Sequence, residues 1–252
     1  MTTPHGQTQY QVRFDWGIEG AAAIAEDADV VIVIDVLSFS TTVDLAVSLG
    51  AQVLPADPTE VDAAAARSGA TVAARRGEPG LTLSPASVTE HTVAAGTRVV
   101  LPSPNGSRVV AALAAGTATV VVASLRNRTA VAEWALAQQG DKGDRFFIAI
   151  IAAGEQREDG STRFAVEDLL GAGAVIDALA DVGLDYCSPE SAAAAAAFTG
   201  LRNATGHLVG ASASGRELAG EGYRADIDLA IEIDASSTVP ILRADGFIAA
   251  SV

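Results

Sequence analysis

Short runs of branched apolar residues, separated by alanine-rich stretches at helical spacing, constrain the fold of this chain more than any other feature. Most of these runs lack the alternation of a half-exposed strand, which is typical of strands covered on both faces. They predict strands at residues 30–34, 52–54, 71–74, 98–101, 119–123 and 146–152. Because strands alternate with helices, we expect a layered α/β/α fold with a mostly parallel sheet.

Helix-forming stretches lie between the expected strands and dominate the last third of the chain. Helices are expected at residues 40–49, 61–67, 105–115, 127–139, 164–182, 189–198 and 206–218, followed by a strand near 239–242. Residues 75–92 and 154–163 break this rhythm, and long irregular segments of that kind are often functional. We expect one α/β domain over residues 1–252, or two tightly packed subdomains with a boundary near residues 153–165.

The balance of charge excludes several classes of function. The chain has 31 Asp and Glu against 16 Lys and Arg, a formal net charge of −15. Such a surface repels nucleic acids and anionic lipids, so we expect neither as a partner. A single cysteine suits a reducing compartment, and no apolar run approaches the ~20 residues of a membrane span. The sequence therefore predicts a soluble, cytoplasmic protein and leaves its oligomeric state open, a homo-oligomer included.

Several common catalytic motifs are missing from the sequence. Lys142 is the only lysine and follows no glycine-rich phosphate loop, and no Gly-x-Ser-x-Gly elbow of an α/β-hydrolase is present. Gly171 and Gly173 resemble the start of a dinucleotide fingerprint, but they lie in an expected helix and the third glycine is missing. Asp35 ends a strand as the nucleophile of a haloacid-type phosphatase would. Leu37, however, stands where that chemistry needs a second aspartate.

Polar residues follow the expected strands at the points where the strands end. Ligands of open α/β sheets bind at the carboxyl ends of the strands, so these residues are candidates for a site. Asp35 follows the first strand, with Ser38, Thr41 and Thr42 at the start of the next helix. A helix N-terminus with hydroxyls is a plausible anion cradle, although helix capping explains the hydroxyls equally well.

The later strands end in the same kind of residue. After them come Arg76 and Glu78; Asn105, Gly106, Ser107 and Arg108; Ser124 and Asn127; and Gly154. Glu167 and Asp168 lie near the start of the expected helix 164–182, where the helix dipole favours acids about as well as metal binding would. We expect the loop tips that carry Asp35, Glu78 and Asn105 to converge.

This set of residues fits one type of chemistry. Mg²⁺ takes oxygen ligands and is usually held by one or two carboxylates together with water and substrate phosphate. The planar fork of arginine suits phosphate or sulfonate oxygens. The combination predicts Mg²⁺-assisted hydrolysis of a small, highly anionic phosphate ester.

At these positions the sequence resembles the 2-phosphosulfolactate phosphatases (the ComB family). The resembling segments are residues 33–42, 77–78, 84–85, 101–107, 123–127, 153–154, 167–173 and 212–218, with Gly222, Asp226 and residues 239–240. The resemblance implies a Mg²⁺-dependent phosphatase that converts 2-phospho-3-sulfolactate to 3-sulfolactate and phosphate. One departure stands out: Ser38 and Phe39 replace an Arg-Ala pair that is common in the family. Arg76, Arg108 or Arg126 are the candidates to replace the missing arginine.

The roles follow from the residue types, and some remain alternatives. The catalytic candidates are Asp35, Glu78 and Asp168, and Glu167 joins them as a candidate Mg²⁺ ligand. The expected substrate-binding residues are Ser38, Thr41, Thr42, Arg76, Asn105, Gly106, Ser107, Arg108, Ser124, Asn127 and Gly154. Whether each carboxylate is a metal ligand or a nucleophile stays open, a covalent aspartyl phosphate on Asp35 included. Two alternatives stay open. The substrate is another small phosphorylated acid, or the protein binds anions on the same fold without catalysis.

Overall fold

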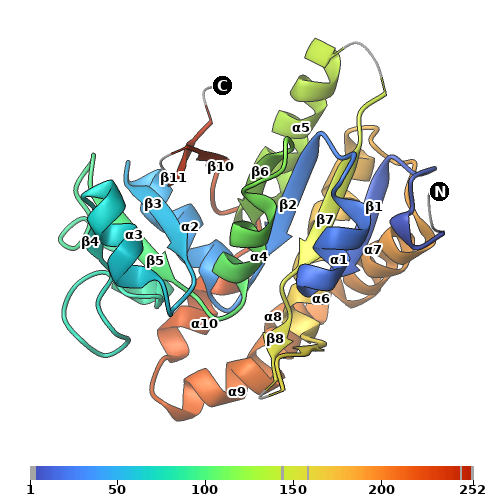
Figure 1. Cartoon of the computed structure of the whole chain (residues 1–252). Helices are drawn as coiled ribbons and strands as arrows, with labels where there is room; N and C mark the ends of the chain where they lie inside the picture. Colours follow the sequence, from blue (N-terminus) through green and yellow to red (C-terminus); the bar gives the residue numbers. More distant parts are fainter. Residues whose placement is uncertain (1–3, 143–144, 158, 245, 251–252) are drawn as a thin grey trace.

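A nine-stranded sheet runs through the molecule, and helices pack on both of its faces (Figure 1). The computed structural model describes residues 4–142, 145–157, 159–244 and 246–250. The strands follow one another across the sheet as β1 (Val12–Trp16), β7 (Ile148–Ala152), β2 (Val30–Ile34), β6 (Thr119–Ala123), β10 (Pro240–Arg243), β11 (Gly246–Ala249), β3 (Gln52–Ala56), β5 (Arg98–Pro102) and β4 (Thr71–Val72). The expected strands are all present, which confirms the α/β fold.

The sheet consists of two parallel blocks joined by a hairpin. Strands β1, β7, β2 and β6 pair in parallel, and so do β3, β5 and β4. The β10–β11 hairpin lies between the blocks, with Ile241 opposite Val121 and Phe247 opposite Val53, both antiparallel. The sheet is therefore mostly parallel, as expected. Its antiparallel part comes from the β10–β11 hairpin, because two neighbouring strands joined by a short connection must run antiparallel.

The continuous apolar character of β2 is explained by burial on both faces. Val30, Ile32 and Ile34 pack in one hydrophobic cluster with residues of the helices α5 (Arg128–Lys142), α6 (Val166–Asp181) and α7 (Pro189–Leu201). Val31 and Val33 point to the other face and pack in a second cluster with residues of α1 (Gly17–Ile24), α2 (Phe39–Ser48) and α4 (Gly106–Leu113). A strand with a helix layer on each side has no solvent-facing positions, so its sequence does not alternate.

The helices agree with the sequence predictions except at a few places. They are α1 (Gly17–Ile24), α2 (Phe39–Ser48), α3 (Val61–Ser68), α4 (Gly106–Leu113), α5 (Arg128–Lys142), α6 (Val166–Asp181), α7 (Pro189–Leu201), α8 (Thr205–Ala211), α9 (Ala213–Gly220) and α10 (Arg224–Ala230). The single helix expected at 206–218 is in fact α8 and α9. Ser212 separates them, because its backbone is extended and its side chain caps α9 by accepting the Gly215 N–H at 3.0 Å.

The edge strand β1 and the helix α1 were not expected. Arg13 interrupts the apolar pattern of β1, yet its side chain is buried. The guanidinium forms an ion pair with Asp27 and donates to the Tyr10 carbonyl at 3.1 Å. A buried arginine is tolerated when such partners satisfy it, and the pattern of hydrophobicity alone does not reveal them.

The two irregular segments have different structures. Residues 75–92 contain a single turn of 3-10 helix at Pro85–Ser87 and otherwise form loops. Within residues 154–163, β8 (Glu155–Gln156) and β9 (Thr162–Arg163) pair as a small antiparallel sheet. The choice between one domain and two subdomains divided near residues 153–165 stays a prediction. Among the described residues, no helix has both the length and the apolar character that a membrane span requires.

Candidate functional site

Asp35 lies where β2, β5 and α4 meet, and backbone groups hold both of its carboxylate oxygens. Its Oδ2 accepts the Gly106 N–H at 2.8 Å and lies 3.4 Å from the Ser103 hydroxyl, and its Oδ1 accepts the Phe39 N–H at 3.2 Å. A Cβ at position 106 would come within 2.7 Å of that Oδ2, so only glycine allows this approach. The carboxyl end of β2 and the start of α4 thus form one structure around Asp35.

Asp168 connects two other strand ends. From the first turn of α6, its Oδ1 accepts the Val36 N–H at 2.8 Å and its Oδ2 accepts the Gly154 N–H at 2.9 Å. Gly154 has a φ of 63°, a conformation that favours glycine. Asp168 therefore joins the segments that follow β2 and β7, at the same carboxyl-terminal edge of the parallel strands as Asp35.

Glu167 extends this group of acids towards α9 and the β8–β9 hairpin. The Ser214 hydroxyl is within hydrogen-bonding distance of both Glu167 and Glu155, and Glu155 also pairs with Arg163. A hydroxyl has one proton, so it donates to one of these two carboxylates at a time. Glu167 and Ser214 are buried. We call Asp35, Glu167 and Asp168 the acidic cluster.

Two carboxyls of the acidic cluster, those of Asp35 and Asp168, have raised pKa values. Burial raises the pKa of Asp35 to about 6, against opposing hydrogen bonds from Gly106 and Phe39, and the charge of Glu167 adds to the rise. Burial also raises the pKa of Asp168 well above its ordinary value, and the charges of Asp35 and Glu167 raise it further. Carboxyls that repel one another in a buried place favour a proton or a cation among them.

Most of the predicted hydroxyl residues bind the backbone around the acidic cluster. Thr41 donates to the Val36 carbonyl at 2.8 Å and Thr42 to the Leu83 carbonyl at 2.9 Å. The Ser107 hydroxyl lies 2.6 and 2.7 Å from the Ser103 and Ala56 carbonyls and donates to one of them at a time. Their protons serve to hold the loops in these positions, and their roles in binding a substrate stay predictions.

Ser124 and Asn127 form a reciprocal cap after β6. The Asn127 side chain accepts the Ser124 N–H at 2.9 Å and donates to the Thr238 carbonyl at 3.1 Å. The Ser124 hydroxyl accepts the Arg126 N–H at 3.2 Å. These contacts brace the end of β6 against the segment before β10, and none of them reaches the acidic cluster.

Three further predicted residues, two from the loop 75–92 and one from α4, are placed differently by the structure. Glu78 is exposed and accepts the Arg75 N–H at 3.1 Å, with no hydrogen bond or ion pair to the acidic cluster among the described residues. Arg108 forms a half-exposed ion pair with Asp57 at 3.1 Å. Arg76 is the predicted arginine that reaches the segment after Asp35, with its Nη2 3.4 Å from the Ser38 hydroxyl. The expected convergence thus includes Asp35 and the Asn105 loop, and Glu78 as a metal ligand stays a prediction.

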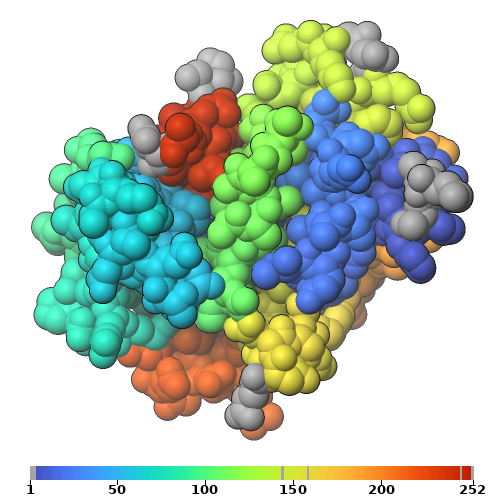
Figure 2. All heavy atoms as spheres, in the orientation of Figure 1, coloured from blue at the N-terminus to red at the C-terminus, as the bar shows by residue number. Residues whose placement is uncertain are grey.

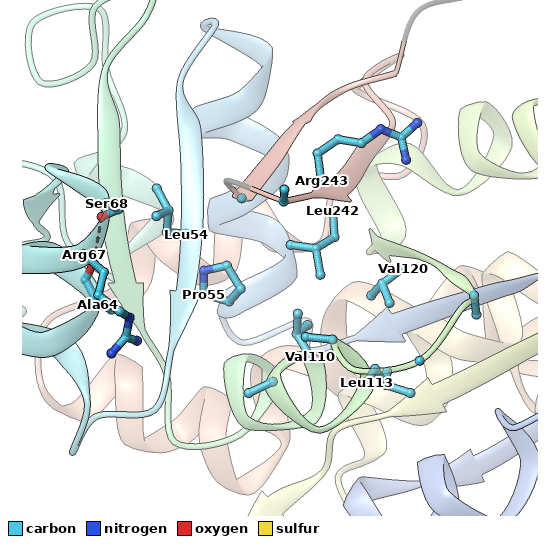
Figure 3. Close-up of a pocket in the computed structure, with 16 residues that line it drawn as sticks. Leu54, Pro55, Ala64, Arg67, Ser68, Val110, Leu113, Val120, Leu242 and Arg243 are labelled. Atoms are coloured by element: carbon cyan, nitrogen blue, oxygen red, sulfur yellow. Dashed lines mark hydrogen bonds between the residues drawn. The ribbon is translucent and has the colours of Figure 1, made fainter.

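Two cavities differ in their relation to this site. Asn105, whose side chain accepts the Gln156 N–H at 3.1 Å, lines a cavity of about 140 Å³ together with Gly17, Ala153 and Thr162. Its lining residues Ala153 and Asn105 precede Gly154 and Gly106, whose N–H groups hold Asp168 and Asp35. A larger hollow of about 680 Å³ opens between α3 and α4 (Figure 2) and has apolar walls that include Leu54, Val110 and Leu242 (Figure 3). None of the predicted site residues lines it.

Sequence reasoning assigned no role to Glu155, Ser214 and Asp226. Glu155 and Ser214 contact each other and the acidic cluster through Glu167, and Asp226 pairs with Arg76. Ser214 and Asp226 lie in or beside segments that resemble the family, which was the available signal. Among the described residues, no three His, Cys, Asp or Glu side chains are close enough to hold a metal ion by themselves.

Comparison with known proteins gives a consistent result. The family model described as 2-phosphosulpholactate phosphatase matches residues 20–245. A probable 2-phosphosulfolactate phosphatase of Deinococcus radiodurans is 34% identical over 223 residues, which cover 85% of this chain and 88% of the relative. The 2-phosphosulfolactate phosphatase of Methanothermobacter thermautotrophicus is 30% identical over 222 residues, which cover 86% and 88% of the two chains. The match spans the acidic cluster and the strands that carry it, and the chain belongs to the 2-phosphosulfolactate phosphatase family of hydrolases.

Proposed function

We propose that the protein hydrolyses 2-phospho-3-sulfolactate, or a similar small phosphorylated acid, to the free hydroxy acid and inorganic phosphate. The observation that carries the proposal is the acidic cluster, in which the buried Asp35 after β2 and two adjacent buried acids of α6 lie near the ends of parallel strands and affect one another electrostatically. Family membership supports the reaction, and the net charge of −15 explains why an anionic substrate needs a local site.

Magnesium fits the chemistry of the acidic cluster. Burial and mutual repulsion raise the pKa of Asp35 and Asp168, and a divalent cation would relieve both effects. We infer that Asp35 and Glu167 hold Mg²⁺, with water and phosphate oxygens as its remaining ligands, as is usual for this ion. When bound, Mg²⁺ would neutralise charge on the phosphoryl group. Both Asp168 oxygens accept backbone N–H groups, as those of Asp35 do, so Asp168 holds the loops after β2 and β7 and stays a candidate metal ligand.

When Asp35 is not a metal ligand, its carboxyl can instead supply proton chemistry. A carboxyl whose pKa is about 6 can take up a proton from an attacking water near neutral pH, where general bases work best. Direct attack by the Asp35 carboxylate on phosphorus is the alternative route. The stereochemical course at a phosphorus made chiral with oxygen isotopes separates the two, because direct attack by water inverts the configuration and a double displacement through Asp35 retains it.

The test is release of phosphate from a panel of phosphosulfolactate, phospholactate, phosphoglycolate and the phosphoglycerates, with Mg²⁺ or with EDTA. We expect turnover of at least one member that requires Mg²⁺ and is lost in Asp35→Asn. Asp62→Asn, an exposed change on α3, is the matched control and keeps wild-type activity. Binding of the panel by calorimetry with no phosphate released would favour the non-catalytic alternative. Full activity of Asp35→Asn would remove Asp35 from the mechanism.

A further inference from the structure

Asp226 is a fully buried carboxylate that the proposed reaction does not use. It lies on α10, and its exposed fraction is 0%. It pairs with the Arg76 guanidinium, accepts a hydrogen bond from the Ser84 hydroxyl and accepts the Ala86 N–H at 3.1 Å. Burying a carboxylate is unfavourable unless it is paired and hydrogen-bonded, so these three partners account for its presence. All three lie in the long irregular segment 75–92, which Asp226 therefore fixes against α10.

These contacts hold the Arg76 side chain in one orientation. Its guanidinium carbon lies 4.9 Å from the centre of the Tyr223 ring, a cation–π arrangement, and Asp226 pairs with one edge. Its Nη2 is 3.4 Å from both the Ser38 hydroxyl and the Leu83 carbonyl. Ser38 immediately precedes α2, so the guanidinium lies at the N-terminal end of the helix that follows Asp35.

Arg76 keeps capacity for another anion, unlike Arg126 and Arg128, the two buried arginines after β6. Arg126 pairs with Asp44 and Glu232, and Arg128 pairs with Asp177 and Asp234, so each has two carboxylate partners. Arg76 has one such partner, and its two 3.4 Å contacts are at the long limit of hydrogen bonding. Its side chain remains 20% exposed, and within the described part of the chain its Nε–H has no acceptor.

We propose that Asp226 is a positioning residue for Arg76, and that the Arg76 guanidinium binds the second acidic group, a sulfonate or a carboxylate, of the phosphorylated acid. The planar guanidinium fork matches the oxygens of such a group, which a lysine would meet only as a point charge. This inference rests on the proposed function, since it assumes that the acidic cluster and its metal receive the phosphate. It makes Arg76 a residue that selects diacids over simple phosphate esters.

The experiment compares two substrates in each variant: phosphosulfolactate, which carries acidic groups besides its phosphate, and p-nitrophenyl phosphate, which carries none. In Arg76→Gln we expect kcat/KM for phosphosulfolactate to fall by ~10–100-fold relative to that for p-nitrophenyl phosphate, because a charge-assisted bidentate contact is lost. Most of the loss appears in KM. Arg76→Lys recovers part of it. In Asp226→Asn the same selectivity falls by ~10-fold, with a smaller change in kcat than in KM.

A double-mutant cycle separates positioning from a general structural effect. If Asp226 acts through Arg76, Asp226→Asn lowers selectivity no further in an Arg76→Gln background. Asp228→Asn is the matched control on the same helix, where Asp228 pairs with Arg224 and both side chains are more than half exposed. Calorimetry with 3-sulfolactate, the product, checks binding directly, and the thermal midpoint of each variant checks folding.

The outcomes are distinct. Equal losses on both substrates, additive losses in the cycle, or unchanged binding of 3-sulfolactate to Arg76→Gln would each overturn the inference while the phosphatase activity of the wild type stands. A wild-type protein that hydrolyses neither substrate with Mg²⁺ would overturn the proposed function, and this inference with it.

Discussion

Two buried polar clusters lie at the ends of neighbouring strands, and they differ in how their charges balance. After β6, Arg126 and Arg128 each pair with two carboxylates, so cations and anions alternate. After β2, Asp35 and the two acids of α6 lie close together, and the closest hydrogen-bond partners of Asp35 and Asp168 are backbone N–H groups. Burial raises the pKa of Asp44 in the first cluster, but the charge of Arg126 opposes the rise.

The difference separates a structural role from a chemical one. A network whose charges are matched within the chain needs nothing from outside, and removing any member leaves a buried charge unpaired. A cluster of acids without a matching cation is unfavourable for the folded protein by itself. Such an arrangement is expected where a ligand completes the balance, and unfavourable groups of this kind concentrate at functional sites.

The largest expected effect is on activity, in Glu167→Gln. Removing this carboxylate takes away a proposed metal ligand, so kcat/KM should fall by ~10²–10⁴-fold. The thermal midpoint of the metal-free protein should stay the same or rise, because repulsion with Asp35 and Asp168 is relieved. Glu217→Gln, an exposed change on α9, is the control. A clear loss of metal-free stability would mean that Glu167 is mainly structural.

The opposite result, a loss of stability with little change in activity, is expected in the cluster of ion pairs after β6. Arg126→Met leaves Asp44 buried without its cation and should lower the free energy of unfolding by ~3–5 kcal/mol, measured by urea denaturation. The kcat of the protein that remains folded should change little. Arg224→Met breaks the exposed pair with Asp228 and should cost less than ~0.5 kcal/mol. If kcat fell in both variants in proportion to the loss of stability, the division between the two clusters would be wrong.

Acid titration of the metal-free protein sharpens the comparison. Because the pKa of Asp35 is 3.8 when unfolded and about 6 when folded, the folded state holds the proton more tightly. The free energy of unfolding should therefore fall as pH rises from about 4 to about 6, by up to ~3 kcal/mol for this group. The difference between wild type and Asp35→Asn, each in EDTA, isolates the contribution. A difference of the opposite sign would contradict the burial of an uncompensated carboxylate.

The smallest expected effect comes from the close approach of α4 to Asp35. A Cβ in Gly106→Ala would lie 2.6 Å from the Phe39 ring and 2.7 Å from the Asp35 carboxylate. We expect a loss of ~1–3 kcal/mol in stability and a fall in kcat of ~10-fold from displaced Asp35. Gly140→Ala, in α5 with open space around it, should instead stabilise by ~0.5 kcal/mol. Unchanged kcat in Gly106→Ala would show that the Gly106 contact does not position Asp35.

The sequence predicts best those strands that are buried on both faces, since all of their residues lie in the same apolar environment. The bounds of β2 and β6 agree with prediction because these strands are buried on both faces. Asp35 was found for the same reason, since a carboxylate directly after an apolar run is conspicuous. β1 was missed because Arg13 depends on Asp27 and on carbonyls outside the strand.

The site was harder to predict where its contacts are long-range. Glu155 and Glu167 meet at Ser214, 59 and 47 residues away along the chain, and Arg76 meets Asp226 at a separation of 150 residues. No local pattern encodes such pairs. Glu78 shows the converse: its position after a strand suggested the site, but the turn at Gly77, with a φ of 90°, leaves Glu78 on the exposed side of its loop.

The place of the β10–β11 hairpin has a consequence for the order of folding. Strands β10 and β11 lie between β6 and β3 in the sheet, so during synthesis β6 and β3 present unpaired edges until the hairpin leaves the ribosome. Bare edges of this kind invite pairing with other chains. The nascent protein should therefore depend on chaperones until this hairpin has been made, and removal of the hairpin should cause aggregation rather than a smaller folded product.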